Sequence, residues 1–234
     1  MQPVNEYKVR IKEIIDEAPD VKTFRVERPP CEFFPGQFFM VRFENNEILK
    51  RAYSVASSPL NKEYIDITMN LVGQFTSRLW KLDVGDNLVF AGPYGKFYFN
   101  DTMKQNLVLI GGGLGITPLM SIIRYCHDKR LGNKINLVYS VKSSKDIIYW
   151  NEVEQISKDN FDFESVVTVT RPQEDEGWHK RKGRVDRELL KQNIVDIWNS
   201  LFFICGSLEF SKSVIGMLEE LGVKREQIKT DIWG

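Results

Sequence analysis

The sequence predicts an antiparallel β-barrel followed by an α/β domain with a parallel sheet. Up to about residue 100, short strand-like segments follow one another between turn residues, as in small antiparallel barrels. After residue 105, continuous apolar strands alternate with segments of helical spacing, which is typical of a parallel sheet covered by helices. A chain of 234 residues suits two modest domains. We therefore expect domains over residues 1–102 and 103–234.

The first half consists of segments that resemble half-buried strands. In YIDITMNLV (64–72), apolar and polar residues alternate, so that Ile65, Ile67 and Met69 share one face and the polar residues the other. Turn residues, including proline–glycine pairs, separate the segments. The other strands expected here are 7–14, 21–28, 38–43 and 87–94.

The second half begins with the continuous apolar strand NLVLI (106–110). Leu119, Ile122, Ile123 and Cys126 then recur at helical spacing. Further strands are expected at 135–140, 163–170, 200–205 and 227–233, with helices at 148–157 and near 207–221.

Charge and composition exclude several classes of function. Lysine plus arginine number 32, as do aspartate plus glutamate, so nothing favours nucleic acid or an anionic membrane as partner. No apolar run approaches the roughly 20 residues of a membrane span, and the N-terminus lacks an apolar signal core, so we expect a cytoplasmic protein. The three cysteines are far apart and form no Cys-x-x-Cys, which predicts neither a metal site nor an iron–sulfur cluster.

The stretch GGGLGITP (111–118) lies between a predicted strand and a predicted helix. Glycines allow a tight turn and close approach of a ligand, threonine can cap the helix, and free amides at the helix start attract a diphosphate. A purely structural turn is the alternative. An ordinary Rossmann dehydrogenase fits poorly, because VYSVKSS (138–144) contains Lys142 and no acid for the ribose. The residues assigned to this turn are Gly112, Gly113, Gly115, Thr117 and Pro118.

Several motifs, in order along the whole chain, resemble those of the ferredoxin–NADP⁺ reductase superfamily. RAYSVASSP (51–59) is similar to its flavin signature, GGGLGITP to its pyridine-nucleotide turn, and ICGSLEF (204–210) to its Cys-Gly motif. FPGQFFMV (34–41) and GPYGKF (92–97) are similar to its barrel segments, and IKTDIWG to its C-terminal acid-x-aromatic ending. The resemblance implies a flavin-binding barrel and a nucleotide-binding α/β domain. Such proteins move a hydride between NAD(P)H and flavin, and single electrons between flavin and a partner.

The resemblance assigns a flavin site to the first half. Arg51 would pair with the diphosphate, Tyr53 would pack against the isoalloxazine ring, and Ser54 would hydrogen-bond near flavin N5. In GQFTSRLW (73–80) we expect a glycine turn and then a helix capped by Thr76. The backbone amides at the start of this helix would bind the other side of the diphosphate. Two diphosphate contacts favour FAD over FMN. An edge strand and an ordinary capped helix are the alternatives. The remaining residues assigned to this cofactor are Ala52, Met69, Asn70, Leu71, Gly73 and Phe75.

Four residues are assigned to catalysis, namely Ser54 and three near the coenzyme. The resemblance places Cys205, followed by Gly206, beside the nicotinamide, where it orients the ring; buried cysteine is otherwise a small hydrophobe. Asp231 stands where relatives have glutamate and is one methylene shorter. Trp233 would cover the flavin face that the nicotinamide needs, or else it is plain core packing.

Lys142 and Arg171 follow the second and third strands of the second half, where members of the family contact the adenosine ribose of the coenzyme. These two cations favour NADPH over NADH. The loop 171–184 is long enough to suggest function or mobility. Its basic part, HKRKGRV (179–185), is either a solvated face or a docking surface for an acidic electron carrier.

The function expected is that of an NAD(P)H-dependent flavoprotein reductase, with FAD as cofactor and NADPH or NADH as coenzyme. Electrons would then pass to a separate acceptor such as ferredoxin or another small redox protein. Two alternatives stay open: a flavin reductase that binds flavin loosely as a substrate, and a non-catalytic electron-transfer or redox-sensing subunit.

Overall fold

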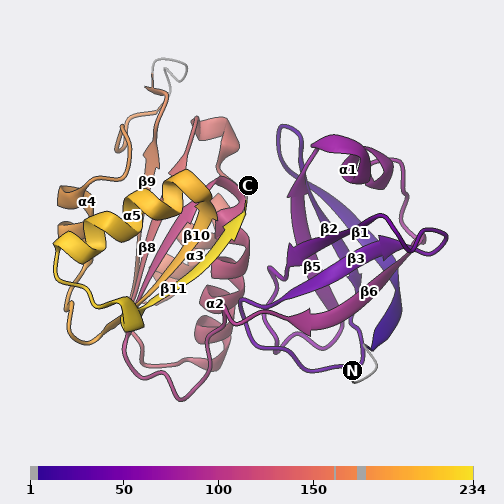
Figure 1. Ribbon diagram of the computed structural model, residues 1–234, viewed down its shortest axis with the longest axis horizontal. Helices are drawn as coiled ribbons and strands as arrows, with labels where there is room; N and C mark the ends of the chain where they lie inside the picture. The colour runs from indigo at the N-terminus through magenta and orange to yellow at the C-terminus, as the bar shows by residue number, and fades with distance from the viewer. Residues whose placement is uncertain (1–4, 161, 173–177, 234) are drawn as a thin grey trace. The chain divides into compact units, whose positions relative to one another are not determined.

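Contacts divide the chain into residues 1–100 with 120–128, and residues 101–119 with 129–234. The structure is a computed structural model that describes residues 5–160, 162–172 and 178–233. The expected boundary after residue 102 stays a prediction. Figure 1 shows the strands and helices of the two units.

The first unit is built on an antiparallel sheet with strand order β4-β3-β6-β1-β2-β5. One short helix, α1, follows β5. Strands β3 and β6 have the bounds expected from the sequence, and β1 is longer than expected. The elements are β1 (Glu6–Ala18), β2 (Val21–Glu27), β3 (Phe38–Phe43), β4 (Lys50–Ser54), β5 (Tyr64–Asn70), α1 (Gly73–Leu79) and β6 (Asn87–Tyr94).

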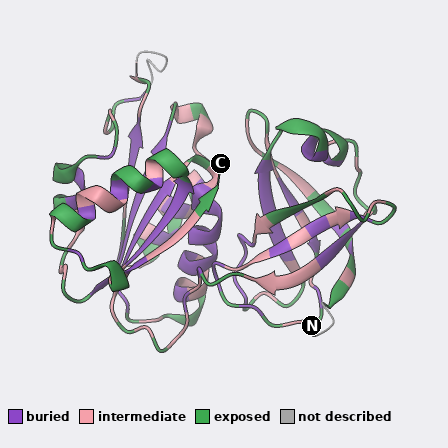
Figure 2. Ribbon diagram, in the orientation of Figure 1, coloured by how far each residue is buried: buried purple, intermediate pink, exposed green. Residues whose placement is uncertain are grey.

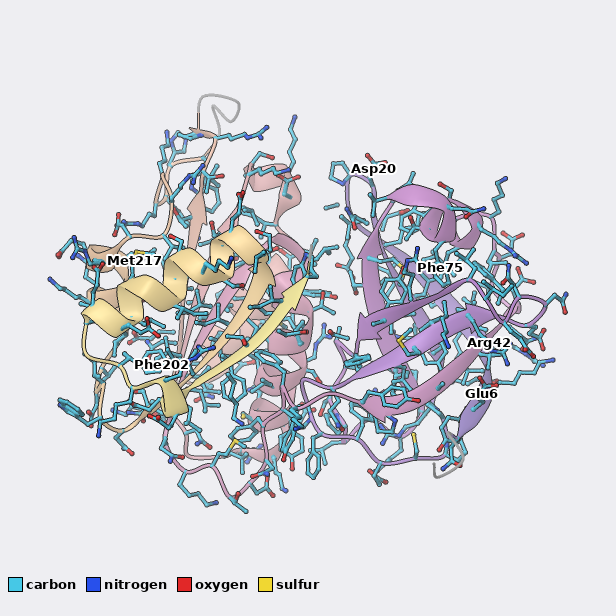
Figure 3. All side chains as sticks on the ribbon, in the orientation of Figure 1. Glu6, Asp20, Arg42, Phe75, Phe202 and Met217 are labelled. Atoms are coloured by element: carbon cyan, nitrogen blue, oxygen red, sulfur yellow. The ribbon has the colours of Figure 1, made fainter. Side chains whose placement is uncertain are left out.

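The two edge strands of this sheet meet just after β4, which closes the sheet into the predicted barrel. Val55 forms an antiparallel bridge with Ile67 of β5. The next residue along, Ala56, donates its N–H to the carbonyl of Asp66 at 2.8 Å. Buried apolar side chains from β1, β2, β3, β5 and β6 fill the interior, together with Phe75 of α1, which is labelled in Figure 3, and the partly buried Tyr53 of β4 packs against them.

Strand β5 is buried on both faces. The polar face holds Asp66 and Thr68, each only 4% exposed. Asp66 accepts two hydrogen bonds from the guanidinium of Arg25, at 2.9 and 3.1 Å, and the hydroxyl of Thr68 lies 2.6 Å from that of Thr23. These partners on β2 satisfy the polar groups, so burial of this face does not leave unpaired donors and acceptors.

The second unit contains a parallel sheet with strand order β11-β10-β7-β8-β9, as expected from the alternating pattern. The strands are β7 (Asn106–Gly112), β8 (Ile135–Val141), β9 (Phe163–Val169), β10 (Ser200–Ser207) and β11 (Ile228–Trp233). Figure 2 shows that β7, β8 and β10 are mostly buried, as expected inside a parallel sheet, whereas the edge strand β11 is mostly intermediate or exposed. The antiparallel barrel and parallel α/β sheet confirm the predicted fold class.

The helices of the second half are α2 (Ile116–Lys129), α3 (Trp150–Asp159), α4 (Arg187–Asn193) and α5 (Leu208–Glu220). Helices α4 and α5 pack on one face of the sheet, where Leu189, Leu190, Val214 and Leu218 join apolar residues of β7, β8 and β10. The sequence did not predict α4, a short helix capped by Asp186. Among the described helices, none has the length and apolar character needed to cross a bilayer.

Candidate functional site

Strand β4 places its signature residues on opposite faces. Tyr53 lies opposite Phe39 of β3, whose side chain is fully buried in the barrel, whereas Ser54 lies opposite Phe38. The ring of Tyr53 also packs 5.7 Å from that of Phe75. Burial raises the pKa of the Tyr53 phenol well above its ordinary value, so this hydroxyl stays protonated at neutral pH.

Arg51 is exposed on β4 beside the equally exposed Ala52. One guanidinium nitrogen donates to the carbonyl oxygen of Lys50 at 2.8 Å. Within the described part of the chain, no carboxylate pairs with Arg51. The remaining N–H groups are therefore available for an external anion, and a guanidinium suits a phosphate oxygen pair.

The turn before α1 differs from the expectation. The helix begins at Gly73, whose φ of +74° is in the left-handed region, and Val72 is the cap. Thr76 is the fourth helical residue; its buried hydroxyl accepts from the N–H of Val72 at 2.7 Å and donates to the Val72 carbonyl at 2.6 Å. The prediction that Thr76 caps the helix start was wrong, because the helix begins at Gly73, four residues before the start that a Thr76 cap implies.

The other residues assigned to the flavin surround this turn. Met69 is buried near the end of β5, and Asn70 is exposed at its last position. Leu71 is 40% exposed, and its N–H donates to the carbonyl of Asp20 at 2.7 Å.

In the second unit, the neighbouring strands β7, β10 and β11 bring the glycine turn, Cys205 and Asp231 to the same end of the sheet. Cys205 of β10 is in register with Gly111 of β7 and with Asp231 of β11. Since the strands are parallel, the glycine turn after β7 and the Cys205–Gly206 pair lie at the carboxyl ends of adjacent strands. Crevices at such edges are where open α/β sheets bind ligands.

The glycine turn has one packed side and one open side. A Cβ on Gly115 would overlap the carbonyl oxygen of Cys205 and would lie 3.0 Å from Cη2 of Trp233. Gly113 has a φ of +54°, and a Cβ there would meet no atom within 4 Å. The turn is therefore fixed against β10 on one side and leaves room on the other.

Helix α2 begins at Ile116, so Thr117 is its second residue. The prediction that Thr117 caps this helix was wrong: its Oγ1 is buried and has no hydrogen-bond partner among the described residues. A 3₁₀ turn over Gly113–Gly115 leads directly into the helix and takes the place of a side-chain cap. A buried, unpaired hydroxyl costs about 1–3 kcal/mol, so a polar ligand at this point would relieve a real penalty. Pro118 is buried in the first turn of the same helix.

The Cys205 thiol lies 3.7 Å from Oδ2 of Asp231. The thiol is buried, and burial followed by the negative charge of Asp231 raises its pKa well above the ordinary value of 9.0. The thiol therefore stays protonated at neutral pH and donates toward the carboxylate. A neutral, buried thiol is a poor nucleophile but a shaped, weakly polar contact surface.

Lys142 and Arg171 are brought together at the ends of β8 and β9, where the N–H of Arg171 donates to the carbonyl of Lys142 at 2.9 Å. Both side chains are exposed. An acid that the sequence motifs did not point to stands close by: Asp146 accepts from the N–H and the hydroxyl of Ser143, at 2.9 and 3.1 Å. The carboxylate of Asp146 is therefore hydrogen-bonded within its own turn.

The basic stretch of the long loop is partly neutralised. Lys180 pairs with Glu154 at 3.3 Å, and Arg181 pairs with Asp186 at 2.6 Å. These pairs favour a solvated face over a docking surface. Residues 173–177 of the same loop, and Gly234 of the C-terminal motif, lie outside the described residues.

Two family models match the chain. The oxidoreductase FAD-binding domain matches residues 8–99, and the oxidoreductase NAD-binding domain matches residues 109–215.

Among curated proteins, the chain is 30% identical, over 97% of its length, to the glycine betaine monooxygenase reductase subunit of Chromohalobacter salexigens. It is 31% identical, over 85% of its length, to one of the subunits of the Na⁺-translocating NADH-quinone reductase of Yersinia pestis. The chain spans 64% and 53% of the lengths of these two relatives.

Solved structures share the fold over nearly the whole chain. A ferredoxin NADP⁺ reductase from Neisseria gonorrhoeae with bound FAD and NADP has a TM-score of 0.83 and 23% identity, over 98% of this chain and 99% of that one. The ferredoxin reductase in carbazole 1,9a-dioxygenase has a TM-score of 0.85 and 23% identity, over 99% of this chain and 69% of that one.

Proposed function

The chain belongs to the ferredoxin–NADP⁺ reductase superfamily of FAD- and NAD-binding oxidoreductases, and on that premise we propose that it transfers a hydride from NAD(P)H to FAD and passes electrons to a separate acceptor. The sequence motifs predicted this family, and the match confirms it. The observation that carries the proposal is at the carboxyl end of the parallel sheet. There the glycine turn after β7 packs against Cys205, and Cys205 is in register with Asp231 on the neighbouring strand. When bound, FAD would supply the chemistry that converts the transfer of a hydride, which carries two electrons, into transfers of single electrons to a carrier.

The residues of the barrel suit a flavin dinucleotide. We assign the diphosphate to Arg51, since its guanidinium is exposed and lacks a carboxylate partner among the described residues. We assign ring packing to Tyr53, whose body is held by Phe75, and a hydrogen bond near flavin N5 to Ser54. A protonated Tyr53 presents no charge that would oppose the flavin.

The residues at the parallel sheet edge suit a nicotinamide dinucleotide. The orphaned Oγ1 of Thr117 supplies a buried hydrogen-bonding group, and the open side of Gly113 gives room for the diphosphate. We assign contact with the nicotinamide ring to Cys205. Its proton is held at Sγ by burial and by Asp231, so the thiol orients the ring without attacking it.

The electron acceptor is proposed to be a separate small redox protein such as a ferredoxin. Both curated relatives named above are reductase subunits, which supports transfer to a partner. A cytoplasmic location stays a prediction from the sequence.

The test begins with the purified protein. We expect it to be yellow with stoichiometric, non-covalent FAD that survives gel filtration, and to bleach anaerobically on addition of NADH or NADPH. Steady-state reduction of ferricyanide should then follow. Loss of FAD on the column with retained reduction of added flavin would favour a flavin reductase instead. Bleaching without turnover would favour a sensing subunit, and a colourless protein that ignores added FAD would refute the proposal.

A further inference from the structure

Phe210, in the first turn of α5, places its ring against two glycines on neighbouring strands. A Cβ added at Gly112, the last residue of β7, would have all three nearest atoms in this ring, at 3.0 to 3.2 Å. A Cβ added at Gly206 of β10 would likewise have its three nearest atoms in this ring, with Cδ1 at 2.6 Å. One aromatic edge therefore fills the space of two missing side chains.

The backbone does not require glycine at either position. Gly112 has a φ of −112° and a ψ of 118°, which any residue adopts in a strand. Gly206 also lies outside the left-handed region. Since conformation is not the reason for these glycines, the ring is the group that excludes a side chain at both.

The start of helix α5 fixes where this ring sits. Ser207 caps the helix by accepting from the N–H of Phe210 at 3.3 Å, and Ser211 donates its hydroxyl to the carbonyl of Gly206 at 3.4 Å. The remainder of the ring packs against the apolar cluster between α5 and the sheet. Phe210 is only partly buried, so part of this residue remains accessible at the surface.

The two turns are thus joined by two different contacts. Phe210 bridges Gly112 and Gly206, and the carbonyl of Cys205 is packed against Gly115. The second contact is backbone against backbone and cannot be adjusted by a side-chain change. The first depends on a single ring, which makes it the adjustable one.

We propose that Phe210 is a positioning residue that sets the spacing between the glycine turn and the Cys205–Gly206 turn, and thereby the affinity for the nicotinamide coenzyme. This inference rests on the proposed function, since it takes these turns to hold NAD(P)H. The ring acts through Gly112 and Gly206. Removing it leaves each turn folded but lets their separation vary.

The experiment compares single and double variants by KM and kcat for NADH and NADPH, FAD content and melting temperature. Phe210→Ala is expected to raise the coenzyme KM about tenfold, which corresponds to a loss of about 1.4 kcal/mol of coenzyme binding free energy. We expect FAD content to be unchanged and kcat to change less than KM. Phe210→Leu should recover most of the loss. Met217→Ala, on the same helix and against the same apolar cluster, is the matched control and should leave KM unchanged.

The decisive comparison asks whether Phe210→Ala suppresses the effect of an added methyl group. Gly206→Ala alone should raise the coenzyme KM, because its methyl group pushes the Phe210 ring away. The double variant Gly206→Ala/Phe210→Ala should have a lower KM than Gly206→Ala alone. Gly112→Ala offers the same test with a looser contact if Gly206→Ala does not fold. Gly115→Ala should not be suppressed by Phe210→Ala, because it meets the backbone of Cys205.

The inference would be overturned if the two substitutions had additive effects on KM in the double variant, or if Phe210→Ala had the same KM as Met217→Ala. In either case, bleaching of the wild-type flavin by NAD(P)H would leave the proposed function standing. A wild-type protein that neither coenzyme reduces would overturn both.

Discussion

Replacing Trp233 by serine separates two roles for this residue. The indole is 41% exposed, at the end of the last strand, and its Cη2 lies 3.0 Å from where a Cβ on Gly115 would be. It therefore stands beside the turn proposed to hold the nicotinamide coenzyme. If the indole and the coenzyme compete for this place, its removal should tighten coenzyme binding.

The expected stability cost is small for so large a side chain. Full burial of a large apolar side chain contributes about 1.5–3 kcal/mol, and little more than half of this indole is covered, so Trp233→Ser should cost about 1–2 kcal/mol. The melting temperature should then fall by about 2–4 °C per kcal/mol in a chain of this size. A buried core aromatic would instead cost about 3–5 kcal/mol on truncation.

The expected gain in affinity follows from the lost competitor. If the indole of Trp233 holds its place by an aromatic stack, that stack contributes about 0.5–1.5 kcal/mol, which the coenzyme must displace. Removing the indole should therefore tighten coenzyme binding by roughly 2- to 10-fold. Titration of the oxidised protein with NAD⁺ and NADP⁺, followed in the flavin spectrum, measures this, and oxidase activity should rise. Trp198→Ser, at an indole that is 75% exposed in the turn before β10, is the control. Unchanged affinity together with a large drop in melting temperature would refute the competition.

Three further outcomes are expected. Arg51→Ala should weaken FAD binding by about 1.5–3 kcal/mol, as for lost charged hydrogen bonds, in a titration of apoprotein with FAD; equal affinity would remove Arg51 from the site. Ser54→Ala and Cys205→Ala should slow anaerobic bleaching in stopped flow while FAD stays bound, and wild-type rates in both would show the roles to be misassigned. Lys142→Ala and Arg171→Ala should lower kcat/KM for NADPH more than for NADH, and a wild-type preference for NADH would contradict the expected preference for NADPH.

Much of the fold follows from the sequence because local patterns determine it. Strands β3 and β6 have their expected bounds because each is a short run rich in apolar residues that begins shortly after turn residues, Pro35-Gly36 before β3 and Gly85 before β6. The parallel sheet was predicted because continuous apolar strands alternate with helical segments. The burial of both faces of β5 was not apparent, since Arg25, the partner of Asp66, lies 41 residues away.

The errors cluster at helix starts. Thr76 and Thr117 are residue types that favour caps, but glycine-containing turns begin both helices earlier and leave the threonines inside them. Capping preference is a local rule, whereas the path of the chain into each helix is set by the strands that precede it. The same misplacement makes Thr117 informative, because its unpaired hydroxyl is visible only in three dimensions. The roles assigned to the site residues stay predictions.

The pairing of β1 with β6 has a consequence for synthesis of the protein. Glu6 faces Ala91, so the centre of the barrel cannot form until the ribosome has released more than ninety residues. The second sheet has the same property, since β7 pairs with β10 and needs the chain through Ser207 before its own centre is complete. At about 5–20 residues per second, the barrel would have roughly 5–25 s to fold before β10 has emerged. Strands that are neighbours along the chain, such as β1 with β2 and β7 with β8, can pair early, but β1 and β7 each keep one edge unpaired until β6 and β10 have emerged. Nascent chains stalled before β6, or between β7 and β10, are therefore the forms most exposed to aggregation.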